Sequence, residues 1–285
     1  MMQERQAQPP FVSTGFVEVN GSQLYYEVAG SGHPLVLSYD MNFFDRRIWD
    51  EQFAAFARSY RVVRYDIRGL GKSTPSTGPY SLAEDLAQVL HALLIESTYL
   101  LNLGGNIALD FVHEYPSCVD ALLIVSPNIS PYPSFDEAMA ALPQTLERYA
   151  PMVEAIKQHD IQRTIDEAMR LFELSSSLLP EAYQHVRTLV TDNLPDFSNP
   201  PQSPIPDIQA FDTRYQWFTH IQAPTLLLIG ANAPSEILTS AKTLEQYIPG
   251  VQRREIAHAQ NLLNVEQPEA FNQAVLAFLQ ASGQS

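Results

Sequence analysis

The chain has 285 residues, 45% of them hydrophobic, and is therefore long enough to bury a sizeable core in one large α/β domain or in a domain with an insertion. Its formal net charge of −15 argues against nucleic acid and anionic membrane surfaces as partners, because both attract clustered Lys and Arg. A single cysteine, Cys118, excludes an internal disulfide, and no long apolar segment or signal-peptide pattern opens the chain, which predicts a cytoplasmic protein.

The chain is expected to enter its fold through an antiparallel pair of strands. Residues 15–19 and 23–28 flank Asn20-Gly21, a dipeptide that favours a two-residue hairpin. The Gln- and Pro-rich residues 1–10, which precede this pair, are expected to form a disordered lead-in.

Short apolar strands then alternate with helical patterns. Strands are expected at 35–38, 61–65, 97–101 and 121–125, and helices at 49–56, 82–94 and 107–115. Ser81 and Glu84 have the spacing of a capping box, which favours a helix start at this point. The alternation predicts a mostly parallel sheet with helices on both faces.

After Ser126 only helical patterns follow, until a strand pattern returns at residue 225. Helices are expected at 135–142, 146–157, 161–174 and 180–193, before a proline-rich loop at 195–206. Strands at 225–229 and 252–256 and helices at 236–247 and 268–279 complete the chain. We predict a core formed by 11–130 and 222–280 and a helical cap at 131–221. This cap would cover the carboxyl edge of the strands, where such sheets bind ligands.

A tight strand-to-helix turn is predicted where an apolar run meets two glycines, at Asn102-Leu103-Gly104-Gly105. Such a turn pushes one side chain out at the top of a sheet. In the motif Gly-x-Ser-x-Gly this side chain is a serine nucleophile, and here Asn102 stands in its place.

Four segments carry a family pattern in detail, namely 44–50, 65–73, 104–109 and 264–268. With the order of the predicted elements, they make the chain resemble the α/β-hydrolase superfamily, in particular its small capped carboxylesterase and enol-lactonase-like branch. The resemblance covers nearly the whole chain apart from its ends. It implies an α/β-hydrolase fold, with a mostly parallel central sheet, helices on both faces and a helical cap insertion. Asp66 and Arg68 are expected to hold the turn at 66–73 above the sheet.

The chemistry of that family needs a nucleophile, a base and an acid, and the resemblance places these at Asn102, Asn261 and Ala233. An amide is not nucleophilic and does not titrate near neutral pH, and alanine has no carboxylate. Residues 126–128 offer no acid at the alternative position. We therefore expect no hydrolysis by a catalytic triad.

The loop that would bind an oxyanion differs from the family pattern as well. It reads Asp40-Met41-Asn42-Phe43, where the family has His-Gly followed by small residues. Bulky side chains there are expected to change how a carbonyl oxygen approaches the backbone N–H groups, although the amide of Leu103 remains as a donor.

Three positions remain as candidates for catalysis. Asp40 follows a buried strand, so its carboxylate is either a desolvated acid or base, or it caps a loop or pairs with Arg68 or Arg47. His258 lies near the base position and alternatively caps a strand end. Asn102 would face Asn261 across the cavity, where the two amides either orient a substrate or bond to each other.

The expected ligand is a small hydrophobic or aromatic molecule. Residues expected to bind it are Tyr39, Asn42, Phe43, Leu103, Asn261 and Leu262. The cap adds aromatic residues, most of them expected to pack its helices and a few to line the cavity: Tyr132, Phe135, Tyr149, Phe172, Tyr183, Phe211, Tyr215, Trp217 and Phe218. No cluster of His, Cys, Asp and Glu has the spacing of a metal site, so neither a metal nor another cofactor is expected.

Three functions fit these observations. The first is a non-hydrolytic enzyme of the cyclase, lyase or isomerase type on a hydrolase scaffold. The second is a small-molecule-binding pseudoenzyme without catalysis. The third is a weak atypical hydrolase that uses water together with His258 or Asp40.

Overall fold

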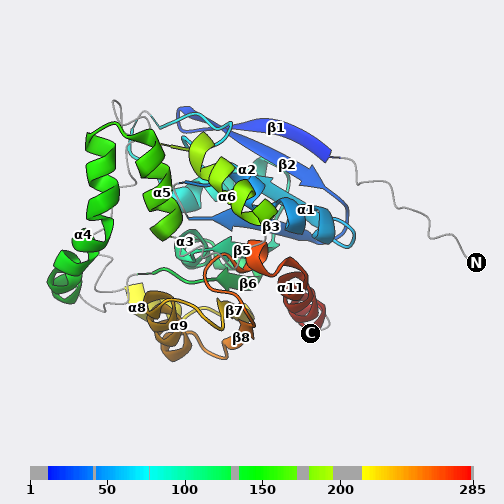
Figure 1. Ribbon diagram of the computed structural model, residues 1–285. Helices are drawn as coiled ribbons and strands as arrows, with labels where there is room; N and C mark the ends of the chain where they lie inside the picture. Colours follow the sequence, from blue (N-terminus) through cyan, green and yellow to red (C-terminus); the bar gives the residue numbers. More distant parts are fainter. Residues whose placement is uncertain are drawn as a thin grey trace, which may run out of the picture.

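The computed structural model describes residues 12–40, 43–76, 78–129, 135–171, 180–194 and 214–283. Their centre is one eight-stranded sheet with the strand order β1-β2-β4-β3-β5-β6-β7-β8 (Figure 1). The first two pairs in this order are antiparallel and the other five are parallel, which confirms the mostly parallel sheet. The strands are β1 (Val12–Val19), β2 (Ser22–Ala29), β3 (Pro34–Tyr39), β4 (Arg61–Tyr65), β5 (Thr98–Leu103), β6 (Val119–Val125), β7 (Thr225–Gly230) and β8 (Gln252–Ile256).

The predicted hairpin joins β1 and β2. Asn20 and Gly21 both have positive φ, at 38° and 77°, as a two-residue turn between twisted strands requires. Val19 pairs with Ser22 directly beside this turn.

Helices cover both faces of the sheet. Arg64 and Tyr65 are consecutive on β4, so their side chains point to opposite faces of the sheet. The Arg64 side chain donates a hydrogen bond to Asp50 at the start of α1, so α1 lies on the face to which Arg64 points. The core helices are α1 (Asp50–Phe56), α2 (Leu82–Ala92), α3 (Asn106–Glu114), α9 (Ser235–Tyr247), α10 (Leu263–Glu266) and α11 (Pro268–Ser282), with 3-10 turns η1 (Arg46–Trp49) and η2 (Pro116–Cys118). The Ser81 hydroxyl caps α2 as predicted, whereas the Glu84 carboxylate accepts a hydrogen bond from Asn20.

The segment between β6 and β7 contains the helices α4 (Phe135–Lys157), α5 (Ile161–Leu171), α6 (Pro180–Asp192) and α8 (Arg214–Phe218). Two helices were expected at 135–142 and 146–157, but α4 is continuous through Pro143 and Pro151. The φ of proline fits a helix, but an interior proline loses one hydrogen bond and its ring crowds the carbonyl of residue i−4, so α4 contains these two prolines at a cost. The residues 1–10 and 195–206 lie outside the described residues.

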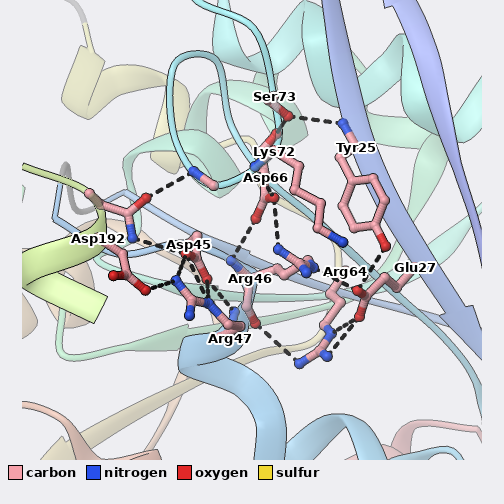
Figure 2. A network of polar contacts seen from close by, with 12 residues as sticks. Tyr25, Glu27, Asp45, Arg46, Arg47, Arg64, Asp66, Lys72, Ser73 and Asp192 are labelled. Atoms are coloured by element: carbon pink, nitrogen blue, oxygen red, sulfur yellow. Dashed lines mark hydrogen bonds and ion pairs between the residues drawn. The ribbon is translucent and has the colours of Figure 1, made fainter. Parts of the chain in front are cut away.

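The end of α6 is fastened to the loops that follow β3 and β4 (Figure 2). The Asn193 side chain accepts a hydrogen bond from the Gly71 N–H at 2.8 Å and donates one to Asp45 at 2.9 Å. Arg47 binds both Asp45 and Asp192, at 2.6 and 2.9 Å. This segment is therefore held at the carboxyl edge of the sheet.

The loop after β4 is built around the buried carboxylate of Asp66. It accepts hydrogen bonds from the backbone N–H groups of Arg46 and Lys72, at 2.8 and 2.9 Å (Figure 2). A Cβ on Gly71, whose φ is +55°, would lie 2.3 Å from this carboxylate, which explains the glycine. The hydroxyl of Ser73 donates to the Asp66 carbonyl at 2.6 Å, so this part of the motif is structural.

Candidate functional site

The turn between β5 and α3 lies two residues later than the sequence suggests. β5 continues through Asn102 and Leu103, because both residues pair with β3 on one side and β6 on the other. The positive φ angles fall on Gly104 and Gly105, at 109° and 102°, and α3 begins at Asn106. Asn102 was expected to project from the top of the sheet, but its side chain is fully buried within the strand.

The amide of Asn102 is completely hydrogen-bonded. Its nitrogen donates to the Ser38 hydroxyl at 2.8 Å and to the Asp40 carboxylate at 3.1 Å. Its oxygen accepts from the Gly105 N–H at 2.6 Å. Asn102 therefore joins the ends of β3 and β5 to the start of α3.

The Asp40 carboxylate lies over the first turn of α3. It accepts hydrogen bonds from the backbone N–H groups of Asn106 and, at 3.2 Å, Ile107. A negative charge is favourable at this end of a helix. The two non-catalytic alternatives for Asp40 were a cap on a loop and an ion pair with Arg68 or Arg47. In the structure Asp40 is a cap, but it caps the start of helix α3 rather than a loop. The arginines bind other carboxylates, Arg68 that of Asp85 and Arg47 those of Asp45 and Asp192.

Asp40 also explains the glycine at the turn. A Cβ on Gly104 would lie 2.9 Å from both the Cβ and a carboxylate oxygen of Asp40. The carboxylate thus takes up the space into which a side chain at the turn would extend.

Burial raises the pKa of Asp40 from its ordinary 3.8 to about 6, against the opposing effect of hydrogen bonds from Asn102, Asn106 and Ile107. A carboxyl group at the carboxyl edge of the sheet that titrates in this range can both give and take a proton near neutral pH.

This raised pKa predicts a specific pH dependence of stability. The folded protein holds the Asp40 proton more tightly than the unfolded chain, so the contribution to stability is present below pH 3.8 and is lost as the pH rises through about 6. Relative to Asp40→Asn, the free energy of unfolding should fall by about 1–3 kcal/mol between pH 4 and pH 7. Urea unfolding of both proteins across this range measures the difference, and parallel curves would contradict the assignment.

The Asn102 amide does not bond to Asn261, because its partners are Ser38, Asp40 and Gly105. Asn261 is buried, and its backbone carbonyl accepts a hydrogen bond from the Ser126 hydroxyl at 2.6 Å. Its backbone N–H donates to Glu266 at 2.9 Å. The side-chain oxygen of Asn261 has no hydrogen-bond partner among the described residues.

The other candidate residues differ in exposure. His258 is exposed in the turn after β8 with a φ of 60°, and Ala233 is half-buried after β7. Tyr39 is buried and its hydroxyl accepts a hydrogen bond from the Ile67 N–H at 3.2 Å. The remaining residues expected to bind the ligand are placed as follows: Leu103 and Leu262 buried, Phe43 half-buried, and Asn42 outside the described residues.

Sequence reasoning missed Ser38 as a site residue. The only signal for it was a polar side chain at the end of the apolar run 35–38. Its role depends on the parallel register that pairs it with Asn102. Within the described ranges, no group of three or more His, Cys, Asp and Glu side chains is arranged to hold a metal ion.

The aromatic residues between β6 and β7 pack mostly on the core where they are described. Tyr215 and Phe218 are buried, and Trp217 stacks on His113 of α3 at 3.9 Å. Tyr183 is half-buried and Tyr149 is exposed. Among the helices that the structure describes, none has the length and apolar character needed to cross a membrane.

The sheet order, with the strand-turn-helix unit at β5 and the helices inserted between β6 and β7, defines an α/β protein. Its candidate site lies at the carboxyl edge of the strands. The chain belongs to the α/β hydrolase fold family, whose sequence profile matches residues 30–268. This finding confirms the resemblance at the level of the superfamily.

Two similar proteins are matched over most of their length. The 3-oxoadipate enol-lactonase 1 of Acinetobacter baylyi is 27% identical over 246 residues, covering 83% of this chain and 85% of that protein. The crystal structure of carboxylesterase CesB from Bacillus subtilis has a TM-score of 0.75 at 23% identity and covers 95% of this chain and 92% of its own. This structural likeness supports the fold.

Other relatives are matched only in part. RutD of Azorhizobium caulinodans, named as a carbamate hydrolase, is 34% identical over 110 residues, which cover 37% of this chain and 41% of that protein. A soluble epoxide hydrolase of a Corynebacterium is 30% identical over 114 residues, 39% of its length. The chain therefore spans less than half the length of these relatives.

Proposed function

We propose that this protein is a non-hydrolytic enzyme that transfers a proton within a small hydrophobic molecule, as an isomerase, lyase or cyclase does, with Asp40 as the acid and base. The observation that carries the proposal is the Asp40 carboxylate at the carboxyl edge of β3, with a pKa of about 6.

The residues at the turn after β5 argue against the reaction of the esterases. The motif puts Asn102 in the nucleophile position, while the sharp turn itself falls at Gly104. Neither residue has a hydroxyl or thiol group, so no acyl-enzyme forms at either one. His258, the histidine nearest the base position, is exposed in the turn after β8.

In the proposed step, the Asp40 carboxylate removes a proton from a carbon next to a carbonyl group. The C–H bond breaks, an O–H bond forms on Asp40, and the electron pair moves into an enolate. Asp40 then returns the proton to another atom of the same molecule, or to a leaving group. The ligand would lie between the carboxyl edge of the sheet and the helices inserted after β6.

Replacement of Asp40 by Asn is expected to reduce this proton transfer about 100-fold or more, because a general base contributes about 10²–10⁴-fold. The test uses enol lactones, cyclic keto esters and aromatic ketones in D2O, and proton NMR detects exchange at carbon. The enol-lactonase relative motivates the lactones. The rate should rise with pH through about 6, as the carboxylate forms.

The control is His258→Ala, which should retain the full rate because this side chain is exposed. Exchange that survives Asp40→Asn would overturn the proposal. Ester hydrolysis that is lost in His258→Ala, or labelling of the unmodified protein by a serine-directed phosphonate, would instead support the atypical hydrolase.

One observation favours a second candidate, a small-molecule-binding protein without catalysis. The Asp40 carboxylate accepts three hydrogen bonds within the protein, and both ends of the Asn102 amide are bound there as well, as is common for purely structural groups. Native mass spectrometry of the purified protein tests this candidate. A retained ligand that is equally bound by Asp40→Asn, with no exchange at carbon, would support it.

A further inference from the structure

We infer that Asn102 is a positioning residue: together with Ser38 it fixes the Asp40 carboxylate over the first turn of α3 and donates to it a hydrogen bond that favours its charged form. The contacts of Asn102 carry this inference, and only its catalytic consequence rests on the proposed function. Asn102 does not touch the reacting atoms, because its side chain is fully buried beneath Asp40.

The orientation of the Asn102 amide is determined by its partners. The Gly105 N–H is a donor at 2.6 Å, so the amide oxygen must face α3. The amide nitrogen then faces β3 and directs one hydrogen to Ser38, at 2.8 Å, and the other to Asp40, at 3.1 Å. The Asn102 amide is therefore held by three hydrogen bonds to three parts of the chain.

Ser38 holds the other side of this arrangement. In the parallel register it lies directly opposite Asn102, and its buried hydroxyl accepts one hydrogen of the amide. Asp40 follows two residues later, and its own N–H donates to the Leu103 carbonyl at 2.9 Å. Backbone and side-chain contacts between β3 and β5 therefore place the carboxylate relative to α3.

Asparagine suits this position better than similar residues do. Leucine has a similar volume but donates no hydrogen bond. Aspartate accepts the Gly105 N–H but presents a second carboxylate to Asp40, and two carboxylates that share a site oppose each other's ionisation. Serine is too short to join both neighbours. Asn102 thus stabilises the charged form of Asp40 against the cost of its burial.

The experiment follows the titration of Asp40 directly, by carbon NMR of protein labelled at its aspartate carboxyl groups, with Asp40→Asn to assign the signal. In Asn102→Leu the midpoint is expected to rise by about one pH unit, a tenfold change in proton affinity. Ser38→Ala, a smaller change, should raise the midpoint by less, because it loosens the amide but keeps its contact to Asp40. If Asn102→Leu fails to fold, the Asp40 midpoint in Ser38→Ala still tests the inference.

The matched control is Asn264→Leu. Asn264 is equally buried, and its amide nitrogen donates to the Ile48 carbonyl at 2.7 Å and to Gln52 at 3.3 Å, away from Asp40. This variant should lose stability but leave the Asp40 midpoint unchanged.

An unchanged midpoint in both Asn102→Leu and Ser38→Ala, or an equal shift in Asn264→Leu, would overturn the inference. A shifted midpoint in a protein that catalyses no exchange at carbon would uphold the positioning role and refute the proposed function. If the protein is an enzyme, Asn102→Leu should also move the pH profile of kcat upward by the same amount.

Discussion

Replacing Asp85 by Ala is expected to lower the free energy of unfolding by about 3–5 kcal/mol, the usual cost of leaving one charge of a buried ion pair without its partner. The Arg68 guanidinium binds both oxygens of Asp85, at 2.5 and 2.6 Å, and the two side chains are only 1% and 2% exposed. Without Asp85, the guanidinium would remain buried next to the Ser22 hydroxyl and the Val19 carbonyl, which are both neutral.

Urea unfolding followed by the fluorescence of the two Trp residues measures this loss. The control is Glu167→Ala, which breaks the pair between Glu167 and Arg170 on the surface of α5, where Arg170 is 52% exposed. That change should cost about 0.5 kcal/mol or less. A loss below about 1 kcal/mol for Asp85→Ala would show that the pair does not anchor the loop after β4 to α2.

The second large effect is expected at Gly104. Replacing it by Ala should destabilise the fold by about 2–4 kcal/mol, because backbone strain and overpacking each cost about 1–3 kcal/mol. The φ of +109° is unfavourable for alanine, and the added Cβ would lie 2.9 Å from the carboxylate and the Cβ of Asp40. Relief of this contact must displace Asp40 from α3, so the titration of Asp40 should change as well.

Gly250→Ala separates the two contributions. The φ of Gly250 is also positive, at +66°, but nothing lies within 4 Å of its added Cβ. This control should therefore lose about 1 kcal/mol, from strain alone. Equal losses in both variants would show that Asp40 does not press against Gly104, and the account of the turn would be wrong.

Several parts of the fold follow from local sequence. The hairpin at Asn20-Gly21, the limits of β4 and the start of α2 at Ser81 depend on turn chemistry, alternation and capping within a few neighbouring residues. The parallel core could be predicted because apolar strands alternate with helical patterns. The superfamily followed from the motifs and was confirmed by the match over residues 30–268.

Errors arose where distant segments decide the outcome. The end of β5 was placed too early, since Asn102 and Leu103 extend the strand by pairing with β3 and β6 rather than by their own propensity. Two helices were expected at 135–142 and 146–157, but α4 is continuous, although it contains Pro143 and Pro151. The triad replacement, the cytoplasmic location and the hydrophobic ligand stay predictions.

By itself the sequence determined the residue types available at the site: a carboxylate at Asp40, amides at Asn102 and Asn261, and two adjacent glycines. Only the tertiary structure decided what these groups contact. It placed Asp40 on the first turn of α3, directed the Asn102 amide to Ser38 and Asp40 and left His258 exposed. The physical reason is the register of parallel strands, which brings together residues far apart in the chain and is not specified by any one segment.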